Sequence, residues 1–192
     1  SFHFQKIFGF LFIFILQFIS AQQIDSIDLI LRKKMPYPEK VELLKKFITK
    51  TEDFDQGIRL INHSISLAKK NNDHVTEGSM LRLKGRTFYF RGTLDSASFY
   101  FYKSLAVLEK EKSPTELALL YNDIGKFYRK TRDFPRALKN YDQALKIYEK
   151  LNDQEGIATI YNESGVVYEY MGENEEALSR YEKSLEIQIN RK

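Results

Sequence analysis

A 40-residue spacing constrains this 192-residue chain more than any other feature of its sequence. Columns of similar residues keep that spacing in a single register without a gap. The columns are Gly85, Gly125 and Gly165; Gly57, Ala97, Ala137 and Ala177; Ile61, Phe101, Tyr141 and Tyr181; Ser64, Ser104, Ala144 and Ser184; and Ile48, Phe88, Tyr128 and Tyr168. Such self-similarity predicts a stack of equivalent units, each burying its apolar face against its neighbours.

Each unit contains two apolar faces with helical spacing. In the third unit the first face falls at i, i+3, i+4 and i+7, at Tyr121, Ile124, Gly125 and Tyr128. The second comprises Phe134, Ala137, Tyr141, Ala144, Leu145 and Tyr148. Small residues where two helices cross let their backbones approach closely. We therefore expect helices at about 38–50, 54–71, 75–91, 94–111, 114–131, 134–151, 154–171 and 174–191, with a short one near 23–34.

Residues between these segments have the chemistry of helix ends. Gly92 and Gly172 suit the left-handed conformation that terminates a helix. Ser113, followed by Pro114 and Glu116, predicts an N-cap with a reciprocal capping carboxylate.

The segment 1–21 has the pattern of a secretory signal peptide. Lys6 precedes the apolar run 7–16, and the small residues Ser20 and Ala21 follow shortly afterwards. The run is short for a transmembrane helix, which needs about 20 residues. We expect cleavage after Ala21 and an exported chain; an uncleaved membrane anchor is the alternative.

Composition limits the chemistry available to the chain. There is no cysteine, so disulfides and thiolate chemistry are excluded. The net charge of +4 is small and mixed with acidic residues, which does not favour nucleic acid as a partner. Phosphate-binding loops and catalytic or metal-binding motifs are not found, and His63 and His74 read as surface or packing residues. We expect no catalytic residues, no metal and no cofactor.

The third unit resembles the tetratricopeptide repeat. The pattern runs Tyr121-x2-Ile124-Gly125-x2-Tyr128 and continues with Ala137, Tyr141 and Ala144. The resemblance implies an all-α fold, an α-solenoid of antiparallel helix hairpins wound into a right-handed superhelix. We expect a signal peptide at 1–21, a cap and bend at 22–37, and four repeats over 38–192. Their bounds are about 38–77, 78–117, 118–157 and 158–192, with repeats continuing beyond the last residue.

The resemblance also implies a binding surface, because the first helix of each pair lines the concave groove of such solenoids. The groove positions that we expect to contact a ligand are Arg82, Arg86, Tyr89, Asn122, Lys126, Arg129, Asn162 and Val166. Their basic excess favours an acidic peptide, since Arg and Lys form charge-assisted bonds with carboxylates. We also expect the double variant Arg82→Glu, Lys126→Glu to keep its fold and lose its ligand.

The function that follows is binding of a protein or peptide, not catalysis. The 40-residue period resembles extended repeats in the extracytoplasmic sensory regions of bacterial signalling proteins, which implies a periplasmic or membrane-associated sensor. A free periplasmic scaffold for envelope complexes is the alternative. We expect no direct membrane binding by the repeats.

Overall fold

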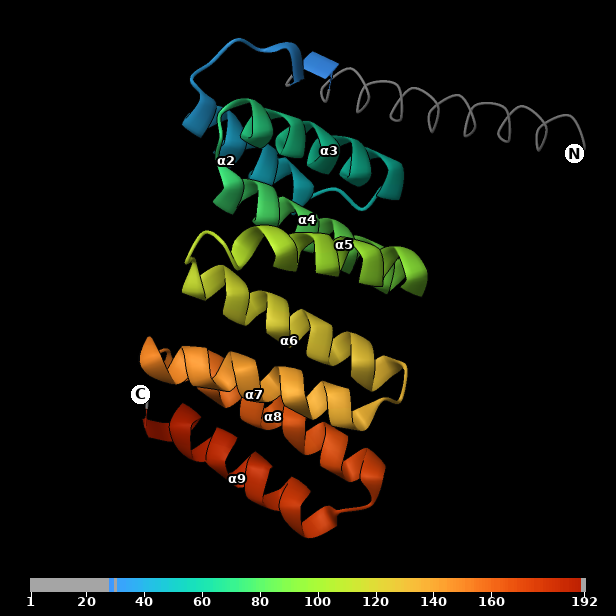
Figure 1. The fold of residues 1–192 in the computed structure, drawn as a ribbon, viewed down its shortest axis with the longest axis vertical. Coiled ribbons are helices and arrows are strands. Elements are labelled where there is room, and N and C mark those ends of the chain that lie inside the picture. Colours follow the sequence, from blue (N-terminus) through green and yellow to red (C-terminus); the bar gives the residue numbers. More distant parts are fainter. Residues whose placement is uncertain (1–27, 30, 191–192) are drawn as a thin grey trace, which may run out of the picture. The chain divides into compact units, whose positions relative to one another are not determined.

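The computed structural model describes residues 28–29 and 31–190, and in that part of the chain every regular element is an α-helix (Figure 1). The signal-peptide prediction, and most of the helix predicted near 23–34, lie outside the described residues. The helices are α2 Tyr37–Ile48, α3 Phe54–Lys70, α4 His74–Arg91, α5 Leu94–Leu108, α6 Pro114–Lys130, α7 Phe134–Lys150, α8 Gln154–Met171 and α9 Asn174–Asn190. Their bounds agree closely with the predicted helices, and the all-α prediction is confirmed.

The chain divides into two units, one ending at His63 and the other beginning at Ser64. The first unit holds α2 and the beginning of α3, with Leu44 and Leu60 fully buried. The Lys40 ammonium donates hydrogen bonds to the carbonyl oxygens of Leu31 (2.9 Å) and Lys33 (2.8 Å), which ties the preceding segment to α2.

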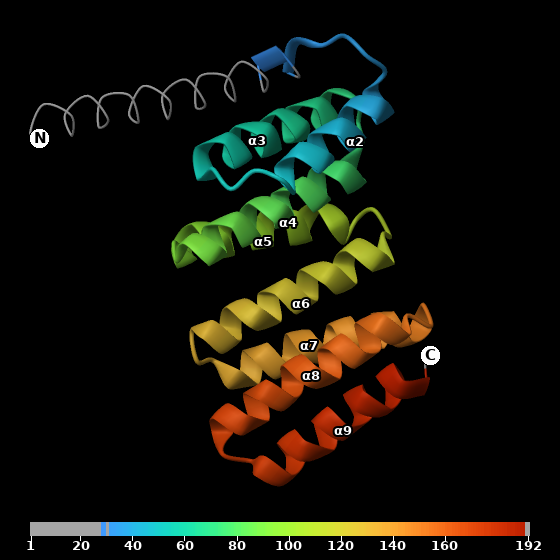
Figure 2. The ribbon, with the colours of Figure 1, turned by 180° about the vertical axis from the view of Figure 1, so that it is seen from behind.

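The second unit contains three consecutive helix pairs, α4–α5, α6–α7 and α8–α9. Seen from both sides, each pair is an antiparallel hairpin (Figures 1 and 2). The first helices of successive pairs also contact one another, α4 with α6 and α6 with α8. Residues on these three helices can therefore form one continuous surface.

The glycine column lies where the two helices of each hairpin cross. A Cβ atom built on Gly125 would lie 2.5 Å from Cε1 of Tyr141, and one on Gly165 would lie 2.7 Å from Cε1 of Tyr181. The aromatic ring thus occupies the space that a side chain on the first helix would need. The predicted pairing of small and aromatic columns is confirmed.

The serine column joins the helices of a hairpin by hydrogen bonds. The buried Ser104 hydroxyl donates to the carbonyl oxygen of Gly78 (2.7 Å), and Ser184 donates in the same way to Ala158 (2.8 Å). Ala144 replaces this serine in the third repeat, where apolar packing takes over.

Lengthening a residue of the alanine column should destabilise the hairpin. Ala137 is fully buried beneath α6, and protein interiors leave little room for added methylene groups. We expect Ala137→Leu to lower the free energy of unfolding by about 1–3 kcal/mol. Urea denaturation followed by far-ultraviolet circular dichroism measures this change, and an unchanged midpoint would contradict the packing.

The helix ends agree with the sequence at the glycines and differ at Ser113. Gly92 and Gly172 end α4 and α8 in the left-handed conformation, with φ of 83° and 80°. Ser113 makes no side-chain capping hydrogen bond, so that prediction was wrong. Glu116, expected to complete the cap, lies instead near Arg82, with 3.5 Å between Oε2 and Nε.

Candidate functional site

All eight predicted groove residues lie on α4, α6 and α8, but their exposure differs widely. Asn162 is exposed, Val166 is half-buried, and Asn122 is buried. The buried Asn122 side chain is thus poorly placed to reach a ligand.

Two of the predicted groove cations are already paired with Asp123 of the next repeat. Arg82 Nη1 lies 2.9 Å from Asp123 Oδ2, and Arg86 Nε lies 3.7 Å from Oδ1. The side chains of Arg82 and Asp123 are only 11% and 10% exposed. Burial raises the pKa of the Asp123 carboxyl, while the guanidinium groups of Arg82 and Arg86 oppose that rise.

The same arrangement recurs one repeat later around Glu163. Lys126 Nζ lies 3.0 Å from Glu163 Oε1, and Arg129 Nη2 lies 3.1 Å from Oε2. Asp123 and Glu163 are separated by one full repeat, so they occupy the same repeat position. Each carboxylate therefore neutralises two cations of the preceding repeat and joins neighbouring hairpins.

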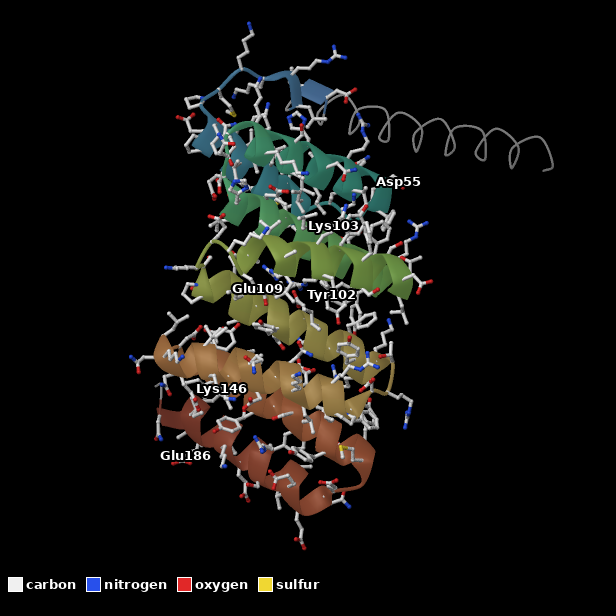
Figure 3. The ribbon with its side chains drawn as sticks, in the orientation of Figure 1. Asp55, Tyr102, Lys103, Glu109, Lys146 and Glu186 are labelled. Carbon is white, nitrogen blue, oxygen red and sulfur yellow. The ribbon has the colours of Figure 1, made fainter. Side chains whose placement is uncertain are left out.

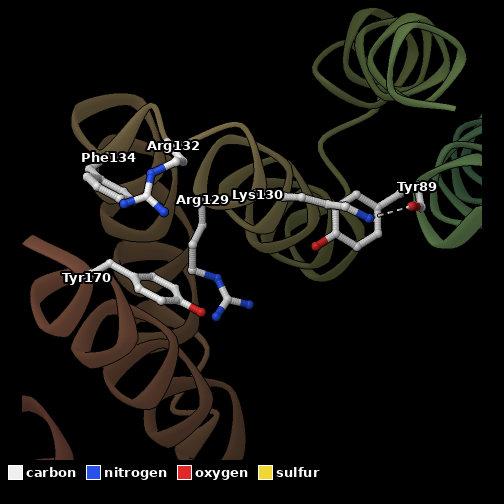
Figure 4. Close-up of a pocket in the computed structure, with 6 residues that line it drawn as sticks. All are labelled: Tyr89, Arg129, Lys130, Arg132, Phe134 and Tyr170. Atoms are coloured by element: carbon white, nitrogen blue, oxygen red, sulfur yellow. Dashed lines mark hydrogen bonds between the residues drawn. The ribbon is translucent and has the colours of Figure 1, made fainter. Parts of the chain in front are cut away.

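A pocket of about 350 Å³ lies where α4, α6 and α8 end, beside the turn between α6 and α7 (Figure 4). Its lining residues are Tyr89, Arg129, Lys130, Arg132, Phe134 and Tyr170. Tyr89 and Arg129 belong to the predicted groove set. The pocket therefore brings together three consecutive repeats at one end of their hairpins.

Aromatic rings hold the cations of the pocket in place. Lys130 Nζ donates to the carbonyl oxygen of Tyr89 (3.2 Å) and lies 4.5 Å from the centre of the Tyr89 ring. The Arg132 guanidinium lies 5.5 Å from the centre of the Phe134 ring. Phe134 in turn stacks on Tyr170, with 6.2 Å between ring centres and planes 13° apart. Cations over ring faces are attracted by the aromatic quadrupole and keep outward N–H groups for other partners.

The charge balance of this pocket is positive. Within the described residues no carboxylate forms an ion pair with Lys130 or Arg132, whereas Arg129 shares Glu163 with Lys126. Burial raises the pKa of Tyr89, so its phenol stays neutral at physiological pH. The pocket thus combines two cations that lack a carboxylate with an aromatic wall, which suits an anionic group attached to an apolar one.

The described residues hold no other arrangement of functional side chains that would suggest chemistry. Among them, no three His, Asp or Glu side chains converge as a metal site would require. Nor does any helix in that part of the chain have the length and apolarity needed to cross a membrane.

Paired antiparallel helices at a fixed period, with a small residue under an aromatic at each crossing, define the tetratricopeptide repeat fold. The sequence model of the family described as Tetratricopeptide repeat matches residues 116–190. A search of the curated proteins found no match. The fold is that of the family, and the match lies in the third and fourth repeats, where the sequence pattern is strongest.

Several solved structures share this fold at low sequence identity. BtubC (BKLC) from P. vanneervenii aligns with a TM-score of 0.70 and 22% identity over 79% of this chain and 62% of its own. A STAND protein with a tetratricopeptide repeat sensor, from Pyrococcus horikoshii, aligns with 0.69 and 19% over 92% and 29%. Aspartyl phosphate phosphatase F from Bacillus subtilis aligns with 0.62 and 12% over 85% and 52%. The chain thus spans less than two thirds of each of these three proteins.

Proposed function

We propose that this chain is a peptide-binding module whose ligand places an acidic group in the pocket between Tyr89, Arg132 and Tyr170. The observation that carries the proposal is the pairing pattern of the cations. Four of the predicted groove cations are held by Asp123 and Glu163, whereas Lys130 and Arg132 have no carboxylate partner among the described residues. An incoming carboxylate would therefore meet its strongest attraction at this pocket.

The pocket also offers what a peptide side chain needs besides charge. Tyr170 is 56% exposed and stacks on Phe134, so an apolar group can cover an existing aromatic surface. Aromatic and arginine side chains carry much of the binding energy of known protein interfaces. The proposed ligand is therefore an acidic segment that also contains an aromatic or apolar residue.

Reversing the two cations tests the proposal. We expect Lys130→Glu with Arg132→Glu to weaken binding of a short synthetic peptide, containing glutamates beside a tyrosine, at least about tenfold, or 1.4 kcal/mol. The melting temperature should stay nearly unchanged, because neither side chain is buried. Titration calorimetry measures the affinity, and a peptide with glutamines in place of the glutamates shows whether charge is required.

A matched control changes the same net charge elsewhere. Lys110 and Lys150 are exposed and follow the second helix of their hairpins or end it, at the opposite end from the pocket. Lys110→Glu with Lys150→Glu should leave the affinity within about twofold. Equal loss of binding in the two double variants would mean that overall charge, and not this pocket, attracts the peptide.

We further propose that the module is exported and serves as the sensory or interaction region of a bacterial signalling protein, with a free periplasmic scaffold as the alternative. The apolar run before Ala21 supports export. The P. horikoshii protein, whose own repeats form a sensor, supports the signalling role. Fusing residues 1–40 to a reporter that is active only outside the cytoplasm tests export; an inactive fusion would refute it.

A further inference from the structure

The helix α9 carries an apolar stripe that no described residue covers. Leu178, Leu185 and Ile189 are spaced i, i+7 and i+11, so they lie along one line of the helix. Their exposed fractions are 58%, 57% and 59%. Three large aliphatic side chains exposed on one line form a contiguous patch and not scattered surface residues.

The equivalent side chains of the preceding repeat show what such a stripe accommodates. Leu138 and Leu145 of α7 stand one repeat before Leu178 and Leu185. Both pack against the hydrophobic core and line one cavity together with Ile160 of α8. On α7, therefore, this pair of leucines receives a helix, and α9 presents the same pair in the same register.

Carboxylates line one edge of the α9 stripe. Glu175, Glu182 and Glu186 lie on the same side of Leu178 and Leu185 in the helical projection, and all three are exposed (Figure 3 labels Glu186). None of them forms an ion pair with any described residue. On α7 the corresponding Asp142 is instead paired with Lys146. The edge of the α9 stripe is thus acidic where that of α7 is neutralised.

We propose that the stripe and acidic edge of α9 form a docking site for an amphipathic helix of a partner protein that carries lysines or arginines beside its apolar face. Opposite charges along the rim would fix the register of such a helix. A second copy of the same face would set carboxylates against carboxylates. An anionic membrane surface would likewise repel this edge. The site is separate from the pocket and does not depend on it.

Two synthetic helical peptides test the site on the full chain. Both have leucines on one face; one has lysines beside them and the other has glutamates. We expect the lysine peptide to bind and the glutamate peptide not to bind, as measured by fluorescence anisotropy. Leu185→Asp should abolish measurable binding of the lysine peptide, and Glu182→Lys should weaken it about fivefold.

The matched control for the charge reversal is Asp142→Lys, at the same repeat position on α7, which should leave binding within about twofold. Equal binding of the two peptides, or binding of neither, would overturn the proposal. So would sedimentation showing that the chain pairs with itself in a Leu185-dependent manner while ignoring the lysine peptide. Loss of pocket binding in the Lys130, Arg132 double variant would leave these results unchanged.

Discussion

Replacing Gly125 by valine is expected to lower the free energy of unfolding by about 3 kcal/mol. The new Cβ would lie 2.5 Å from Cε1 and 2.6 Å from Cδ1 of Tyr141, closer than side chains approach in folded proteins. Tyr141 is 1% exposed and packed in the core, so its ring has nowhere to move. Urea denaturation monitored by circular dichroism gives the change directly.

The matched control is a glycine whose surroundings are open. Gly57 lies inside α3 at the position that alanine occupies in the other repeats, and its nearest neighbour, Thr51 Cγ2, would be 3.5 Å from a new Cβ. Gly57→Ala should therefore raise stability by about 0.5–1 kcal/mol, because alanine favours the helix. If both substitutions changed stability in the same direction, the hairpin crossing would not be the cause.

Replacing Arg82 by alanine is expected to cost about 3 kcal/mol of stability. The substitution would leave Asp123, which is 10% exposed, with only the more distant Arg86 as a partner. An uncompensated buried carboxylate is costly, so α4 and α6 should separate more easily. The earlier expectation that Arg82→Glu with Lys126→Glu keeps its fold is revised, since Arg82→Glu would add a carboxylate beside Asp123 and Glu116.

An exposed pair serves as the control for this effect. Lys146 and Asp142 of α7 are 59% and 52% exposed, and Lys146 lies on the outside of the hairpin (Figure 3). Lys146→Ala should change stability by no more than about 0.5 kcal/mol. A comparable loss in the two variants, measured by thermal melting at two salt concentrations, would show that the Arg82 pair acts no differently from a surface pair.

Much of the fold follows from the sequence because two independent signals agree. The repeat columns fix which positions are equivalent, and the helical spacing within a unit fixes which side of each helix is buried. Gly92 and Gly172 then set the ends of α4 and α8. The cap at Ser113 failed because Glu116 has a better partner in Arg82, which belongs to another repeat and is not visible from local sequence.

The site was less accessible to sequence analysis. Arg82, Arg86, Lys126 and Arg129 were assigned to the groove, but Asp123 and Glu163 were not recognised as their partners. The signal was present, because these two carboxylates stand one repeat period apart. Pairing, however, depends on how far one repeat is shifted against the next, which a single sequence does not reveal. Arg132 and Phe134 were assigned to a turn and a packing face, and their place beside Tyr170 follows from the fold.

The most direct test of the account is a map of amide chemical-shift changes as the acidic peptide is added to the isotopically labelled chain. We predict that the largest changes fall on residues 129–134, with further changes at Tyr89 and Tyr170. Changes concentrated at Asn162 and Val166, with residues 129–134 unaffected, would contradict the proposal that the repeats bind their ligand in the pocket between α4, α6 and α8.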